Sequence, residues 1–260
     1  MERLAYRQEP RNGMSRSHLR LWGLLFAGLG ITGKAIIQNR LLGMGSISSA
    51  ELLQAMMDSQ GVMVLATLAL VLQAVEVCAL PVFCCLLVEG VEHTRNLGLY
   101  FLRVLGVAVL SELPYNLAMS GSLWDLSSRN PVFGLALALG MLLLCKQYAG
   151  KNFSRRALRV LIAVAAILWP MILNVQDGTC TVILVLVLWL SRNRKQMRTF
   201  LGCGAAAMCS LLSPYYLAAP MGFLVVHFYR GHRSEENKAV NYLAYPALLL
   251  AAGLAGNLLI

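Results

Sequence analysis

Glu89 and His93 lie four residues apart at the end of a long apolar segment. On a helix this spacing places both side chains on one side, where a carboxylate can orient an imidazole and stabilise its charge. An imidazole held in this way can act as a general base. We therefore predict that His93 is a catalytic base assisted by Glu89.

Residues that can hold an anion follow directly. Asn96, Tyr100 and Arg103 recur at intervals of four and three residues, so they share one face of a helix, and Arg95 lies in the turn before it. Arginine binds phosphate oxygens through paired hydrogen bonds. We expect a phosphate-rich ligand at this corner. Anchoring of helix ends at a membrane surface remains an alternative for the same residues.

A second polar group lies further along the chain. Glu112, Tyr115 and Asn116 lie at the far end of the same expected helix, and Asn130 and Asp177 lie in later loops. These five residues are expected to gather on the other side of the membrane. Capping of helix ends at the loops is an alternative that the sequence leaves open.

Glu76 is the third informative carboxylate, because it lies near the middle of an apolar segment. An ionisable side chain at the centre of a bilayer costs roughly 2.5–3.5 kcal/mol on insertion scales. Such a residue is expected to face the protein interior or a water-filled cavity.

The chain that carries these residues is very apolar. Of its 260 residues, 58% are hydrophobic and only 13% are charged, and the mean hydropathy is +0.65. Ordinary soluble domains carry about 25% charged residues, so this composition excludes a water-soluble domain. It predicts an all-α fold, namely a polytopic integral membrane helix bundle.

About nine transmembrane helices are expected, because apolar runs of near-spanning length recur along the chain. A kink is expected in the second, since Pro81 cannot donate a helical hydrogen bond and frees a backbone carbonyl. The expected spans are 21–38, 62–92, 98–118, 131–149, 157–174, 180–191, 200–214, 218–229 and 241–260.

Basic residues predict the orientation of these spans. With the N-terminus inside, 19 of the 22 Lys and Arg residues lie in inner segments. The expected topology is N-in and C-out, with residues 1–20 as a basic cytoplasmic tail and residues 21–260 as a single transmembrane helical domain. Orientation and contact with anionic membrane lipid account for the net charge of +10, so no nucleic-acid partner is expected.

The seven cysteines lie mostly in apolar runs without paired ligand spacings. We interpret them as buried small hydrophobic residues and expect no metal site. The basic N-terminus runs into a full-length apolar segment without a small-residue cleavage site, so it is not read as a removable signal.

Short motifs in a fixed order resemble the TraX family of membrane proteins. The core of that family reads P-[IL]-F, L-V-E-G, H-T-R-N, a Tyr, an Arg and S-E-x-P-[FY]. The matching residues here are Pro81-Val82-Phe83, Leu87-Val88-Glu89-Gly90, His93-Thr94-Arg95-Asn96, Tyr100, Arg103, Ser111-Glu112 and Pro114-Tyr115. The resemblance is specific over residues 78–140, and the later Tyr245-Pro246 is similar to the start of the family's closing span.

The resemblance implies a multi-pass acetyltransferase of the bacterial inner membrane, similar to the protein that acetylates conjugative pilin from acetyl-CoA. Acetyl-CoA would then be the donor substrate, and the acceptor would be a pilin, a glycan, a lipid or a small amine. The implied catalytic residues are His93, Glu89 and Glu112; the implied donor-binding residues are Arg95, Asn96, Tyr100 and Arg103. The acceptor side would hold Tyr115, Asn116, Asn130 and Asp177.

Two positions depart from the family pattern. The family carries an Asp-His pair in the first span, where this chain has Thr32-Gly33-Lys34, and a His after the final Tyr-Pro, where Ala247-Leu248 follow. A base at either position is absent here. The alternative function is a membrane transporter or envelope scaffold, in which the intramembrane Glu residues serve a proton or substrate pathway.

Overall fold

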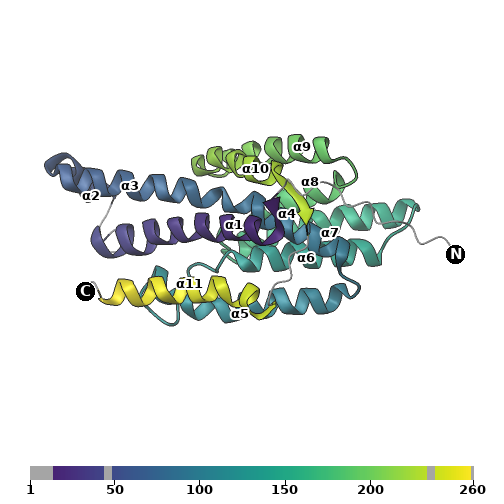
Figure 1. Cartoon of the computed structure of the whole chain (residues 1–260), viewed down its shortest axis with the longest axis horizontal. Helices are drawn as coiled ribbons and strands as arrows, with labels where there is room; N and C mark the ends of the chain where they lie inside the picture. The colour runs from purple at the N-terminus through teal and green to yellow at the C-terminus, as the bar shows by residue number, and fades with distance from the viewer. Residues whose placement is uncertain (1–13, 44–48, 233–237, 259–260) are drawn as a thin grey trace.

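The computed structural model describes residues 14–43, 49–232 and 238–258, and most of them are helical. The α-helices run mainly along the long axis of the molecule (Figure 1). They are α1 Arg16–Ile31, α2 Ser49–Asp58, α3 Gln60–Val77, α4 Ala79–His93, α5 Leu97–Met119, α6 Val132–Gln147, α7 Phe153–Ile172, α8 Gly178–Leu190, α9 Lys195–Met208, α10 Ala219–His227 and α11 Lys238–Leu258.

Shorter elements join these helices. A π-helix, η1 Thr32–Leu41, continues α1, and two 3₁₀ segments, η2 Cys209–Leu211 and η3 Pro214–Ala218, lie between α9 and α10. Strand β1 Met14–Ser15 pairs in parallel with β2 Tyr229–His232. This pairing brings the start of α1 next to the chain that follows α10.

The all-α prediction is confirmed for the described residues, and each expected span coincides with helical structure. Three helical segments in these ranges are long and apolar enough to cross a membrane: Arg16–Leu41, Gln60–His93 and Leu97–Met119. Shorter apolar helices cover Val132–Gln147, Gly178–Leu190 and Tyr242–Leu258. The apolar helices fit a membrane protein, while the count of nine crossings stays a prediction. Helix α2, η1 and the strand pair are not predicted by the sequence patterns.

Helix α4 forms the centre of the bundle. Ten of its 15 residues are buried, and it contacts α1, α8 and α10. A helix that is apolar on all sides is stable only when neighbours cover every side. The break before α4 lies at Cys78, between α3 and α4. Its cause is Pro81, whose ring clashes with the carbonyl group four residues earlier, that of Val77.

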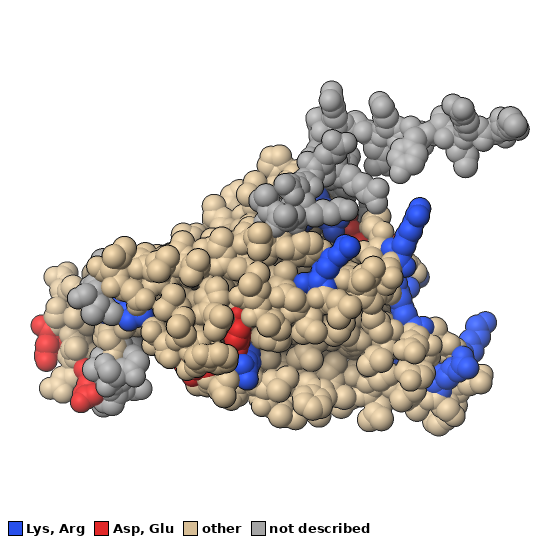
Figure 2. Space-filling view, turned by 90° about the horizontal axis from the view of Figure 1, so that it is seen from below, with Lys and Arg blue, Asp and Glu red and all other residues tan. Residues whose placement is uncertain are grey.

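The charged side chains are distributed unevenly. Figure 2 shows most of the visible Lys and Arg side chains toward one end of the molecule, with a few in the middle and near the other end, whereas Asp and Glu side chains appear mainly toward that other end and the middle. The helices between the two ends present mostly uncharged surface in this view. This arrangement agrees with basic residues concentrated on one side of a membrane.

Close backbone contact holds α10 against the start of α4. A Cβ atom added to Gly222 would lie 2.2 Å from the carbonyl oxygen of Cys78. The Cys78 thiol also donates to the carbonyl oxygen of Ala218, with an S···O distance of 3.3 Å. Because both sides of the Gly222 contact are main chain, no side-chain rotation can make room for a larger residue.

We expect Gly222→Ala to lower the melting temperature of the purified protein, because the new methyl group must push α10 away from α4. Overpacking of this kind costs about 1–3 kcal/mol. Gly204→Ala is the matched control, since no atom lies within 4 Å of its added Cβ. Thermal unfolding in detergent would measure both variants, and equal melting temperatures for the two would contradict the packing argument.

Candidate functional site

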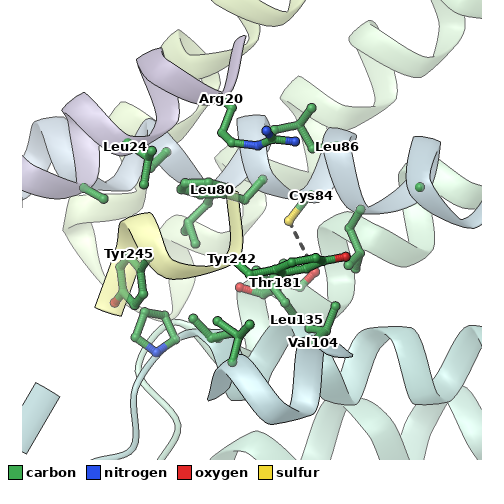
Figure 3. Close-up of a pocket in the computed structure, with 18 of the residues that line it drawn as sticks. Arg20, Leu24, Leu80, Cys84, Leu86, Val104, Leu135, Thr181, Tyr242 and Tyr245 are labelled. Atoms are coloured by element: carbon green, nitrogen blue, oxygen red, sulfur yellow. Dashed lines mark hydrogen bonds between the residues drawn. The ribbon is translucent and has the colours of Figure 1, made fainter. Parts of the chain in front are cut away.

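A cavity of about 650 Å³ extends along α4. Both Ala79 and His93, the first and last residues of α4, line it. At 1.5 Å per residue these positions are about 21 Å apart, so the cavity is elongated. Its other walls come from α1, α5 and α11, with contributions from the ends of α3, α6 and α8. Figure 3 shows the lining residues from these helices turned toward a common space.

Cationic residues line one end of the cavity, which we call the arginine end. Arg16 and Arg20 are four residues apart on α1 and therefore share a face, and Arg103 reaches the same cavity from α5. Figure 3 shows the guanidinium group of Arg20 extending toward α4. The Nε atom of Arg16 is buried and has no hydrogen-bond partner among the described residues. A buried donor of this kind is normally satisfied, so it points to an anionic ligand.

His93 lies at the arginine end, with Thr94 beside it. Its Nδ1 atom donates to the backbone carbonyl oxygen of Glu89 at 2.9 Å. This bond leaves Nε2 as the acceptor of the neutral imidazole. The Glu89 carboxylate instead accepts a hydrogen bond from the hydroxyl of Tyr229. The main chain of Glu89, rather than its carboxylate, therefore orients His93.

Two of the four predicted donor-binding residues line the cavity. Tyr100 and Arg103 contribute to its wall, whereas Arg95 and Asn96 lie outside the lining. The Oδ1 atom of Asn96 accepts a hydrogen bond from the backbone N–H of Leu99 at 3.1 Å. Asn96 is thus the N-cap of α5, a position at which asparagine is strongly preferred.

Two carboxylates line the opposite part, which we call the carboxylate end. Glu76 comes from the end of α3, and Asp177 comes from the turn before α8. Asp177 has a positive φ of 55° and occupies the N-cap position of α8, yet its side chain makes no cap hydrogen bond. Its carboxylate accepts instead from the hydroxyl of Tyr216 at 2.5 Å. Tyr245 of α11 also lines the cavity and lies within electrostatic range of both acids.

Gln176 links the carboxylate end to α5. Its Nε2 atom is 3.5 Å from Glu76 Oε1, and its Oε1 atom accepts from the Tyr115 hydroxyl at 2.7 Å. Lys34 is a basic group within electrostatic range of Glu76, and Asp177 is an acidic one. Gln176 therefore links Glu76 to Tyr115. Asp177, which follows Gln176 in the sequence, faces the same cavity.

Glu112 contacts Asn130, with which the sequence analysis grouped it. It lies outside the cavity lining, and its carboxylate is 3.0 Å from Arg129 Nη1 and 2.6 Å from Asn130 Nδ2. Asn130 also accepts the backbone N–H of Val132 at 3.1 Å, which caps the start of α6. Glu112 and Asn130 thus fasten the α5–α6 loop, so the structure does not place either at the reacting end.

Of the remaining residues predicted for the acceptor side, two reach the cavity and one does not. Asp177 lines the cavity, and Tyr115 reaches it indirectly through Gln176. Asn116 is buried and its Nδ2 atom is 3.4 Å from the carbonyl oxygen of Leu123. The sequence analysis missed Arg16 and Arg20 as site residues, although their four-residue spacing is visible, because basic residues before a span also fit membrane anchoring.

In the described ranges, no group of three or more His, Cys, Asp or Glu side chains is arranged to hold a metal ion. The cavity lining offers arginine, histidine, carboxylate, tyrosine and threonine side chains, together with the thiol of Cys84.

We expect Glu112→Gln to lower the melting temperature, because the change leaves Arg129 without its ion pair. Loss of a partly buried charged hydrogen bond costs about 1.5–3 kcal/mol. Asp125→Asn is the control in the same loop and should unfold like the unmodified chain, because the amide oxygen can still accept the hydrogen bond from the Ser127 backbone N–H. Thermal unfolding combined with acetyl-CoA turnover would measure both. An unchanged melting temperature together with lost turnover would restore the catalytic role predicted for Glu112.

Comparison with known proteins gives one match. The family model described as TraX protein matches residues 52–255. The matched region contains both acids of the carboxylate end, together with His93 and Arg103, and it begins after α1. No curated protein and no solved structure matches.

Proposed function

The chain belongs to the TraX family, and on this premise we propose that it is an integral membrane acetyltransferase. It would move an acetyl group from acetyl-CoA to an acceptor at or across the membrane. The observation that carries the proposal is the elongated cavity, with three arginines at one end and two carboxylates at the other.

The arginine end fits the phosphates of the donor. Arg16, Arg20 and Arg103 together supply three guanidinium groups, and the buried Nε of Arg16 would gain the acceptor that it lacks. Guanidinium groups bind phosphate oxygens with strong, directional hydrogen bonds. His93 would add a further hydrogen-bonding group at this end.

The middle of the cavity fits a slender, weakly polar part of the donor, the chain between its phosphates and its thioester. Its wall there includes apolar side chains from four helices, namely Leu24 of α1, Leu80 and Phe83 of α4, Val104 of α5 and Leu135 of α6. If the phosphates of the donor bind at the arginine end, a chain about as long as the cavity places the thioester at the carboxylate end. Acetyl-CoA supplies an activated acyl group there.

Glu76 and Asp177 are the groups that would act at the thioester. One carboxylate takes the proton of the acceptor as the acceptor forms its bond to the acetyl carbon. The carbon–sulfur bond breaks, the carboxylate passes that proton to the sulfur, and the donor leaves as a thiol. Tyr216 holds Asp177 in position, and Gln176 makes a longer contact to Glu76; positioning of a carboxylate is what general base catalysis requires. This assignment moves the base from His93 to the carboxylate end.

The topology of the proposal follows the sequence. We place the chain in the bacterial inner membrane with about nine crossings, the N-terminus and the arginine end inside, and the C-terminus outside. Acetyl-CoA would then enter from the cytoplasm. The acceptor would be a pilin, a glycan, a lipid or a small amine.

We expect Arg103→Gln to weaken acetyl-CoA binding by about ten- to hundredfold, because a charge-assisted phosphate contact is worth about 1.5–3 kcal/mol. Arg95→Gln removes the same charge eight residues away but outside the cavity lining, so it should bind normally. Thermal stabilisation of the detergent-purified protein by acetyl-CoA would measure both. No saturable stabilisation of the unmodified chain at millimolar acetyl-CoA would favour the transporter or scaffold alternative.

We expect Glu76→Gln and Asp177→Asn to lower kcat for acetyl-CoA hydrolysis, with water as acceptor, by about 10²- to 10⁴-fold. Their KM for acetyl-CoA should change little, because neither acid lies at the arginine end. His93→Ala should do the reverse, raising KM with kcat within a few-fold. A large loss of kcat in His93→Ala, with normal turnover in both acid variants, would return the role of base to His93.

A further inference from the structure

Two cationic side chains share the ring of Trp189, near the end of α8. The Nζ atom of Lys146 lies 4.8 Å from the ring centroid, and the Cζ atom of Arg192 lies 3.8 Å from it. Both distances fall within the range of cation–π attraction, which is strongest for tryptophan. Lys146 belongs to the last turn of α6 and Arg192 follows α8, so the ring brings together two separate helix ends.

Main-chain carbonyl groups fix the same two cations. Lys146 Nζ is 3.5 Å from the carbonyl oxygen of Val91, and Arg192 Nη1 donates to the carbonyl oxygen of Trp189 at 2.9 Å. An ammonium group has three N–H donors and a guanidinium group has five. Each side chain is therefore held in place while several of its donors remain available to a ligand.

The local charge is positive. Lys146 lies within electrostatic range of Arg192, which repels it, and of one acid, Glu92. Within the described part of the chain, neither Lys146 nor Arg192 forms a salt bridge. The two like charges repel each other, and an anion bound between them would offset that repulsion. Neither residue lines the cavity described above, so an anion bound here would occupy a separate site.

The surroundings indicate which anion it is. Leu190, next to Trp189, is 71% exposed, and Leu144 on α6 is 39% exposed. The helices α6 and α8 are apolar along their lengths, whereas polar residues follow each helix at this end. Cations and a tryptophan at the edge of an apolar helical surface are typical of the level of lipid headgroups.

We propose that Lys146, Trp189 and Arg192 form a binding site for the phosphate group of an anionic phospholipid. The phosphate lies between the ammonium and guanidinium groups, and the acyl chains lie along the exposed apolar sides of α6 and α8. This site does not depend on the proposed acetyl transfer.

The test compares two double variants of the full chain. Lys146→Gln/Arg192→Gln removes the two cations at Trp189, and Arg155→Gln/Arg156→Gln removes two exposed cations from the start of α7. Native mass spectrometry would count bound phosphatidylglycerol and phosphatidylcholine in about 0.5 M salt, where the Debye length of a few ångströms suppresses diffuse attraction. Normal elution on size exclusion would establish that each variant is folded.

We expect the unmodified chain and the Arg155/Arg156 variant to prefer phosphatidylglycerol equally. The Lys146/Arg192 variant should lose about thirtyfold of that preference, since each cation near a lipid phosphate contributes about 1 kcal/mol. Equal losses in both variants, or no loss in either, would overturn the proposal.

Two further experiments distinguish binding of a lipid from binding of a soluble phosphate. Brominated phosphatidylglycerol should quench tryptophan fluorescence more in the unmodified chain than in Trp189→Phe, because Trp189 contacts the lipid. Inorganic phosphate and glycerol phosphate, which lack acyl chains, should not compete at millimolar concentration. Full competition by either soluble phosphate, or equal quenching in Trp189→Phe, would exclude a lipid site here.

Discussion

The satisfaction of polar groups inside an apolar bundle is the constraint on which this structure depends. A carboxylate or amide removed from water is expensive unless a partner replaces its hydration. The Glu112 carboxylate pairs with Arg129 and accepts a hydrogen bond from Asn130. Tyr115 donates to Gln176, and Tyr216 donates to Asp177. Each of these contacts also joins two segments of the chain. The polar residues of the bundle therefore act as its fastenings as well as its candidate chemistry.

Two residues that line the cavity are incompletely satisfied. The Nε atom of Arg16 has no partner in the described ranges, and Glu76 has only a long contact of 3.5 Å to Gln176. Close packing elsewhere makes this contrast possible. Helix α4 is enclosed on three sides by α1, α8 and α10, so the space along it is bounded by rigid walls. A cavity in a packed interior that is lined by incompletely paired charges is a common form of ligand site.

The sequence predicted the helices well, because twenty-residue apolar runs have few structural solutions. It predicted the site less well. The four-residue spacing of Glu89 and His93 correctly placed them on one side of α4. The Glu89 carboxylate, however, accepts a hydrogen bond from Tyr229, which is 140 residues away in sequence. Glu112 likewise forms a salt bridge with Arg129 across a loop, and no periodic pattern in the sequence predicts the path of that loop. Helical spacing reports which residues share a face, whereas partners on other elements depend on tertiary packing.

The family match bears on how the two ends of the cavity differ. Residues 52–255 contain Glu76, Asp177, His93 and Arg103, whereas α1, with Arg16 and Arg20, lies before the match. Both acids of the carboxylate end therefore come from the matched part of the chain, although Gly30 of α1 packs against Glu76. The arginine end combines that part with a helix outside it, held in place where β1 pairs with β2. In the proposed acetyl transfer, the acids that act at the thioester would thus lie in the matched region, and α1 would add two arginines for the anionic end of the donor.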